Sequence, residues 1–273
     1  MFNPQVIFMG SKPGSVVGLE YLIKKKWDIL AVVVSKEIEY PWYEENNLRD
    51  HAKKLGIPVI IQSEIDPSIE VDYIISYMYR HMVKKHVRQL ARYASINFHA
   101  APLPEYGGWG TYNRAIIEES TYFGCTCHHM GDGFDDGPIV SIRKFPIDPF
   151  NITAFDLERM AQVEMIKLFV DVVNLIETNQ KLPSVNQDRS KSNYLSFEEM
   201  ESLKKIPDYA TDEQIERLAR AFWFPPHKGA FIENNGKHIE PTPALIKNLI
   251  SREQGKLSYL QIQNIMNDYS KLY

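Results

Sequence analysis

Apolar and polar positions along the first 180 residues form alternating blocks that predict strands and helices in turn. Short apolar runs predict strands at residues 5–9, 29–34, 59–62, 72–76, 95–99, 124–130 and 138–146. Apolar residues with helical spacing predict helices at residues 16–26, 46–55, 84–93, 113–119 and 153–179. This alternation is typical of an α/β fold with a doubly wound, mostly parallel sheet, in which we expect residues 138–146 to form an antiparallel edge strand.

The pattern changes after residue 178, where a polar stretch up to residue 194 predicts a linker. Beyond it we expect short elements, namely helices at 197–206 and 211–221, a β-hairpin at 230–239 and two tail helices in 243–273 that separate near Gly255. Asn235-Gly236 is a strong turn signal for the hairpin. We therefore expect a main domain in residues 1–180 and a small α+β appendage in residues 181–273 that serves dimerisation and nucleotide contact.

Composition narrows the class of protein. The 273 residues carry a net charge of −4, which argues against a protein that acts on nucleic acid, where a basic surface is expected. No apolar run approaches the roughly 20 residues that a membrane-spanning helix needs. The two cysteines, Cys125 and Cys127, face the same way on a predicted strand and do not build a disulfide framework. We expect a cytoplasmic protein that binds neither nucleic acid nor a membrane.

Side chains suited to catalysis lie on the predicted strand 95–99. Alternate residues of a strand point to opposite faces, so Asn97 and His99 share the face opposite Ile96 and Phe98. Carboxylates follow in the glycine-bracketed turn 131–137, where the backbone can approach a ligand closely. An amide that donates, an imidazole that titrates near neutrality and an acid that orients it suit transfer of an acyl group to an amine.

These motifs resemble those of the folate-dependent formyltransferase family, which has Asn-x-His, then Leu-Pro-x-Tyr-x-Gly, then Met-x-x-x-x-Asp-x-Gly. This chain has Asn97-Phe98-His99, Leu103-Pro104-Glu105-Tyr106-Gly107-Gly108 and Met130-Gly131-Asp132-Gly133-Phe134-Asp135-Asp136-Gly137. The resemblance implies a Rossmann-like formyltransferase core in residues 1–180, with 10-formyltetrahydrofolate as the formyl donor.

The resemblance also implies three catalytic residues. The register of the last motif, from Met130 to Gly137, selects Asp135 rather than Asp132 or Asp136. We expect His99 to take the proton of the attacking amine and Asn97 to stabilise the oxyanion. We expect Asp135 to fix the imidazole tautomer and to favour its charged form.

Two further segments resemble nucleotide-sugar N-formyltransferases. Residues 76–82 are close to a Ser-Phe-Tyr-Tyr-Arg-His segment of the domain that formylates UDP-aminoarabinose, and residues 220–230 match a block of the C-terminal part. This implies formylation of a dTDP- or UDP-linked amino sugar, such as dTDP-4-amino-4,6-dideoxyglucose or a 3-amino relative, for O-antigen synthesis. The alternatives are a methionyl-tRNA formyltransferase and a non-catalytic folate-binding regulatory domain.

Candidate binding residues surround the ends of the predicted strands. Those for the sugar nucleotide are Ser11, Lys12, Tyr77, Glu105, Tyr106, Gly107, Gly108, Trp109 and Tyr112, and those for the folate are Met78, Arg80, His81, Met82, Gly131 and Asp132. The turn 10–15 lacks a P-loop or dinucleotide motif, so an anion site at the helix start and a plain turn both stay open. Tyr77 could equally be a core residue, and Lys12 a surface charge.

Two features leave other interpretations open. Cys125, Cys127, His128, His129 and Asp132 have side chains that bind zinc, but their spacing lacks the paired Cys-x-x-Cys pattern, and we expect no metal. The predicted hairpin exposes strand edges, and the large apolar residues Phe222, Trp223, Phe224 and Phe231 are many for so small an appendage. Exposed edges and patches are usually covered, so we expect a homodimer.

Overall fold

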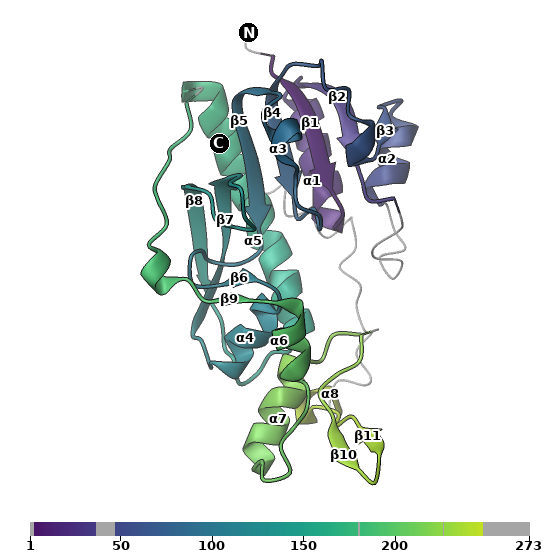
Figure 1. The fold of residues 1–273 in the computed structure, drawn as a ribbon, viewed down its shortest axis with the longest axis vertical. Helices are drawn as coiled ribbons and strands as arrows, with labels where there is room; N and C mark the ends of the chain where they lie inside the picture. Colours follow the sequence, from purple (N-terminus) through teal and green to yellow (C-terminus); the bar gives the residue numbers. More distant parts are fainter. Residues whose placement is uncertain (1–2, 37–46, 180, 226, 248–273) are drawn as a thin grey trace.

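The computed structural model of the chain describes residues 3–36, 47–179, 181–225 and 227–247 (Figure 1). Of the tail expected to form two helices, the described part contains α8 (Ala244–Lys247). The rest of that expectation lies outside the described residues.

A seven-stranded sheet forms the centre of the molecule, in the order β3-β2-β1-β4-β5-β7-β8 (Figure 1). Its strands are β1 (Gln5–Gly10), β2 (Asp28–Val33), β3 (Val59–Ile60), β4 (Val71–Tyr77), β5 (Ala91–His99), β7 (Tyr122–His129) and β8 (Ile139–Pro146). Neighbours from β3 to β5 run parallel, whereas β7 and β8 are antiparallel. The expected mostly parallel α/β sheet and its antiparallel edge strand are confirmed.

Helices and loops cover both faces of the sheet. On one face α1 (Pro13–Lys24) packs against the long helix α5 (Ala154–Asn179), which also contacts β7 and β8. α2 (Leu48–Lys54) contacts α1 at the β2–β3 edge. On the other face Val87 of the short helix α3 (Lys85–Arg88) belongs to a smaller apolar cluster. None of the helices in the described ranges is both long and apolar enough to cross a membrane.

The helix predicted over residues 84–93 is wrong in its extent. α3 ends at Arg88, and β5 begins at Ala91, where it pairs with Val71 of β4. The backbone N–H of Val71 donates to the carbonyl of Leu90. Residues 91–93, for which helical spacing predicts a helix, therefore belong to β5. Pairing with a neighbouring strand outweighs local propensity here.

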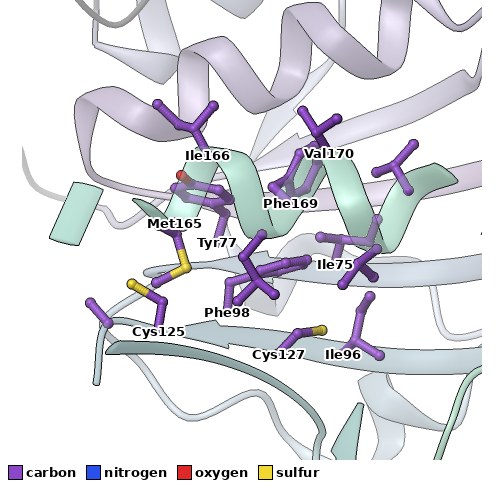
Figure 2. Packing of buried hydrophobic residues seen from close by; sticks show 14 of the residues in the cluster. Ile75, Tyr77, Ile96, Phe98, Cys125, Cys127, Met165, Ile166, Phe169 and Val170 are labelled. Carbon is purple, nitrogen blue, oxygen red and sulfur yellow. The ribbon is translucent and has the colours of Figure 1, made fainter. Parts of the chain in front are cut away.

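Tyr77, expected to bind substrate, lies instead in the main core (Figure 2). Its ring centroid is 5.4 Å from that of Phe169 on α5 and 5.8 Å from that of Phe98 on β5, and its side chain is fully buried. Strand alternation explains the error, because Tyr73, Ile75 and Tyr77 all face α5. Burial raises the pKa of Tyr77 well above its ordinary value, so the hydroxyl stays neutral.

The C-terminal region packs onto α4 (Thr111–Ile117) and the start of α5. Its elements are β9 (Tyr194–Leu195), α6 (Phe197–Ser202), α7 (Asp212–Ala221), β10 (Ile232–Asn234) and β11 (Lys237–Ile239), and β9 pairs with β6 (Gly107–Gly108). Phe222 is buried with Ile116 and Ala154, and Phe231 stacks on His238. Both aromatic side chains therefore pack against other residues of the same chain. The expected homodimer stays a prediction.

Candidate active site

A cavity of about 270 Å³ lies at the carboxyl ends of β1, β4 and β5. Its lining includes Lys12 after β1, Met78 after β4, Asn97 and His99 on β5, and Asp135 in the turn between β7 and β8. The strand order reverses between β1 and β4, and open α/β sheets bind ligands at such a switch point.

The carboxamide of Asn97 is held in one orientation by two neighbours. The Ser76 hydroxyl donates to Asn97 Oδ1 over 2.6 Å, and Asn97 Nδ2 donates to His128 Nε2 over 3.0 Å. His128 Nδ1 lies 2.8 Å from the carbonyl oxygen of His129, so Nδ1 carries the proton and Nε2 accepts. The second N–H of Asn97 makes no hydrogen bond within the described residues and is available to a ligand.

The imidazole of His99 is oriented by a backbone carbonyl. His99 Nε2 lies 2.8 Å from the carbonyl oxygen of Tyr106, which can only accept, so Nε2 carries a proton. His99 Nδ1 lies 3.4 Å from Asp135 Oδ1. The nitrogen that can gain a proton is therefore Nδ1. The carbonyl of Tyr106 therefore fixes the neutral tautomer of His99, whereas the family resemblance predicts that Asp135 does so.

Asp135 is an ionised carboxylate beside two imidazoles. Burial alone would raise its pKa, but the positive charge that His99 and His128 carry when they are protonated, together with the backbone N–H of Gly108, lowers the pKa to about 2. Gly108 donates to Asp135 Oδ2 over 3.2 Å. Because this value lies below the ordinary 3.8, the carboxylate stabilises the fold above that pH, and its contribution is lost as the pH falls towards 2.

The other two aspartates of the turn have different partners. Asp136 Oδ2 accepts the backbone N–H of Gly133 over 2.8 Å, and the exposed Asp132 pairs with Arg88 over 2.7 Å. Of the three candidates, the structure brings Asp135 to His99.

The binding residues expected from the sequence divide into two groups. Those that line the cavity are Lys12, Met78, Arg80, His81, Met82, Gly108, Trp109, Tyr112 and Gly131, and those that lie outside its lining are Ser11, Tyr77, Glu105, Tyr106, Gly107 and Asp132. Tyr106, expected in an exposed aromatic loop, is buried, and its hydroxyl donates to Glu118 over 2.9 Å. Its contribution to the site is the backbone carbonyl that orients His99.

Lys12 lines the cavity but is neither a surface charge nor an uncommitted cation. Its Nζ lies 2.7 Å from Glu158 Oε1 of α5, and both side chains are buried. At the start of α1 the backbone N–H of Gly14 donates to Gln162 Oε1 over 3.3 Å. The charge and this N–H, expected to meet a phosphate, are engaged within the protein, which weakens the interpretation of an anion site.

One family profile, described as Formyl transferase, matches residues 17–173, which is more than half of the chain. The chain belongs to the formyl transferase family. The match includes β5, the β7–β8 turn and therefore Asn97, His99 and Asp135.

Relatives and solved structures agree with this assignment. The methionyl-tRNA formyltransferase of Orientia tsutsugamushi is 26% identical over 255 residues, which cover 89% of this chain and 81% of that protein. A 4-N formyltransferase from Francisella tularensis has a TM-score of 0.72 at 18% identity, with 88% of this chain and 96% of that chain covered. An N-formyltransferase from Helicobacter canadensis, in complex with folinic acid and dTDP-3-aminofucose, has a TM-score of 0.69 at 25% identity. This match covers 86% of this chain and 85% of that chain. The expected family and enzyme class, an N-formyltransferase, are confirmed.

Sequence reasoning missed several residues of this formyltransferase site. The sequence offers His128 as a possible zinc ligand or as a residue of a buried strand next to the site, but not as a partner of Asn97, although its position opposite Asn97 on β7 follows from strand pairing. Ser76 lies beside Asn97 on β4. Tyr194 reaches the cavity from the end of the predicted linker because β9 pairs with β6, a long-range contact without a local sequence signal.

The side chains proposed for zinc do not converge in this formyltransferase. Cys125 and Cys127 point into the core towards Met165 and Phe98 (Figure 2), whereas His128 lines the cavity on the other face of the sheet. Burial raises the pKa of both thiols. Among the residues described, no group of three or more His, Cys, Asp and Glu side chains could hold a metal ion.

We predict that Asp135→Asn lowers kcat of formyl transfer by about 100-fold or more, because it removes the charge beside His99 Nδ1. Asp136→Asn is the matched control: the amide oxygen can still accept the Gly133 N–H, so kcat should stay within a few-fold of wild type. Steady-state kinetics with both variants checks this. Equal losses of kcat in the two variants, or a larger loss in Asp136→Asn, would contradict the assignment of Asp135.

We predict that Lys12→Ala lowers the free energy of unfolding by about 3–5 kcal/mol, because the buried Glu158 carboxylate would lose its positive partner and keep the neutral Gln162 amide. Lys24→Ala, an exposed position on the same helix, should change it by about 0.5 kcal/mol or less. Urea denaturation followed by circular dichroism measures both. Unchanged stability together with a raised KM for the acceptor would restore the phosphate-binding role of Lys12.

Proposed function

We propose that this enzyme transfers a formyl group from 10-formyltetrahydrofolate to the amine of a nucleotide-linked amino sugar, for synthesis of a surface polysaccharide. The observation that carries the reaction is the convergence of Asn97, His99 and Asp135 on one cavity, with His99 Nδ1 3.4 Å from the carboxylate. The Helicobacter canadensis enzyme, in complex with folinic acid and dTDP-3-aminofucose, supports both substrate classes.

In this mechanism His99 acts as the general base. The amine attacks the formyl carbon, and as the new C–N bond forms, the amine proton passes to His99 Nδ1. Nε2 cannot take it, because it already donates to the Tyr106 carbonyl. The ionised Asp135 stabilises the positive charge that the imidazole acquires.

Attack converts the formyl oxygen into an oxyanion of a tetrahedral intermediate. The remaining N–H of Asn97 donates to that oxygen, and one preorganised donor of this kind contributes about 3 kcal/mol. Ser76 and His128 keep the amide from rotating, so it need not reorganise during reaction. Collapse of the intermediate breaks the bond to N10 of the folate, which receives the proton from His99.

The mouth of the cavity offers a surface for a flat ring next to a positive charge. Trp109 is 38% exposed, and its ring centroid lies 5.1 Å from that of Phe197. The Arg80 guanidinium lies 5.3 Å from the Trp109 ring centroid. A nucleobase can stack on such aromatic groups, and an arginine can bind a phosphate. The same cavity is also lined by Met78, His81, Met82 and Gly131, which we propose for contact with the folate.

The second candidate function is formylation of methionyl-tRNA, which the names of the sequence relatives favour. An enzyme that binds transfer RNA contacts its phosphates with basic side chains. The net charge of −4 and the aromatic groups at the cavity mouth favour the smaller acceptor.

The decisive experiment offers both acceptor classes to the purified enzyme with 10-formyltetrahydrofolate and detects products by mass. We expect a gain of one formyl group on a dTDP- or UDP-linked 3-amino or 4-amino sugar and none on methionyl-tRNA. Formylation of methionyl-tRNA alone would overturn the proposed substrate. Folate binding without transfer to either acceptor would favour a regulatory domain.

We predict that Trp109→Ala raises KM for the sugar nucleotide about tenfold, equivalent to about 1.4 kcal/mol, because it removes the stacking surface. KM for the formyl donor should change less than twofold, and the melting temperature little. Tyr209→Ala, at a residue that is 86% exposed and outside the cavity lining, is the control. A lower melting temperature with both KM values unchanged would mean that Trp109 only packs.

A further inference from the structure

A segment outside the matched family profile crosses the turn that carries the catalytic carboxylate. Residues 183–195, all but the last of which belong to the linker expected over residues 179–194, begin with Pro183, whose carbonyl oxygen lies 2.9 Å from His129 Nε2. Val185 exchanges two backbone hydrogen bonds with Ile139 of β8, at 2.7 and 2.9 Å. We call residues 183–195 the strap.

Gln187 in the strap holds the turn directly. Its side-chain Nε2 donates to the carbonyl oxygens of Asp135 and Gly137, each over 2.7 Å. A primary amide has two N–H donors, so both are used on this one turn. The neighbouring Asn186 is exposed and has no such contact among those described.

The turn has a backbone that needs such support. Asp135 has φ +53°, in the left-handed region that is unfavourable for residues other than glycine. At Gly137 an added Cβ would collide with the carbonyl oxygen of His129, so the backbone of the turn packs directly against the end of β7. Strained conformations at functional sites persist when the surrounding contacts determine them.

The far end of the strap fixes the other partner of the carboxylate. Leu195 accepts the backbone N–H of Trp109 over 2.9 Å, and Tyr194 and Leu195 pair with Gly107 and Gly108. Gly108 in turn donates to the carboxylate of Asp135 over 3.2 Å. One segment therefore holds both the backbone of Asp135 and the loop that binds its side chain.

We propose that Gln187 is a positioning residue of the formyltransferase reaction, which holds the Asp135 turn so that the carboxylate faces His99 Nδ1. The inference rests on the role proposed above for Asp135. It assigns a part in catalysis to the strap, in addition to linking the sheet to the C-terminal elements.

The test begins with Gln187→Leu, which keeps most of the side-chain volume and removes both donors. We expect kcat to fall by about 10- to 100-fold, since displacement of a catalytic group by about 1 Å can have an effect of this size. Both KM values should stay within about twofold. Asn186→Ala, in the same strap, should leave all three constants unchanged. If Gln187→Leu does not fold, Gln187→Asn, whose shorter amide does not reach both carbonyls, replaces it.

A double-mutant cycle separates positioning from a general structural effect. In an Asp135→Asn background, Gln187→Leu should lower kcat less than twofold further, because the group that it positions has lost its charge. The same 10- to 100-fold loss in that background would overturn the proposal. So would wild-type kcat in the single variant, or a raised KM with kcat retained.

A crystal structure of Gln187→Leu gives a readout that does not depend on the acceptor. We expect the Asp135 carboxylate to move away from His99 Nδ1 while β5 and β7 stay in place. An unchanged turn would overturn the inference even if the sugar-nucleotide assignment holds. A displaced turn would support it even if the acceptor proves to be a different amine.

Discussion

The antiparallel pairing of β5 with β7 is the constraint on which the site depends. It places Asn97 opposite His128, and the chain then turns back towards β8 so that Asp135 arrives beside His99. The neighbours from β3 to β5 run parallel, whereas β7 pairs antiparallel with both β5 and β8. Antiparallel strands can be joined by a short turn, which parallel strands cannot. The short turn from β7 to β8 therefore delivers the carboxylate to the same cavity as the imidazole.

Each group proposed for catalysis is fixed by an interaction that leaves available the atom proposed to react. Tyr106 binds Nε2 of His99 and leaves Nδ1, whereas Ser76 and His128 bind two of the polar atoms of the Asn97 carboxamide and leave one N–H. The low pKa of Asp135 keeps a negative charge beside Nδ1 at neutral pH. This arrangement suits the proposed mechanism, in which Nδ1 gains a proton and an oxyanion forms near the amide.

The sequence predicts the α/β sheet, the long helix α5 and the face shared by Asn97 and His99, because these follow from local periodicity. It cannot predict contacts made by distant segments. Glu158, which pairs with Lys12, lies on α5, and the strap was expected to be only a linker. Tyr77 was assigned to the site because it ends β4, although alternation along that strand turns its ring towards α5.

We infer that Nδ1 of His99 takes the proton while Nε2 stays bound to the Tyr106 carbonyl. Nitrogen-15 NMR of the imidazole nitrogens, assigned with His99→Asn and followed with pH, measures it directly. We expect a neutral His99 with its proton on Nε2 that gains the second proton on Nδ1, and a neutral His128 with its proton on Nδ1. A neutral His99 with its proton on Nδ1, donated to Asp135, would show that Nδ1 is not the base.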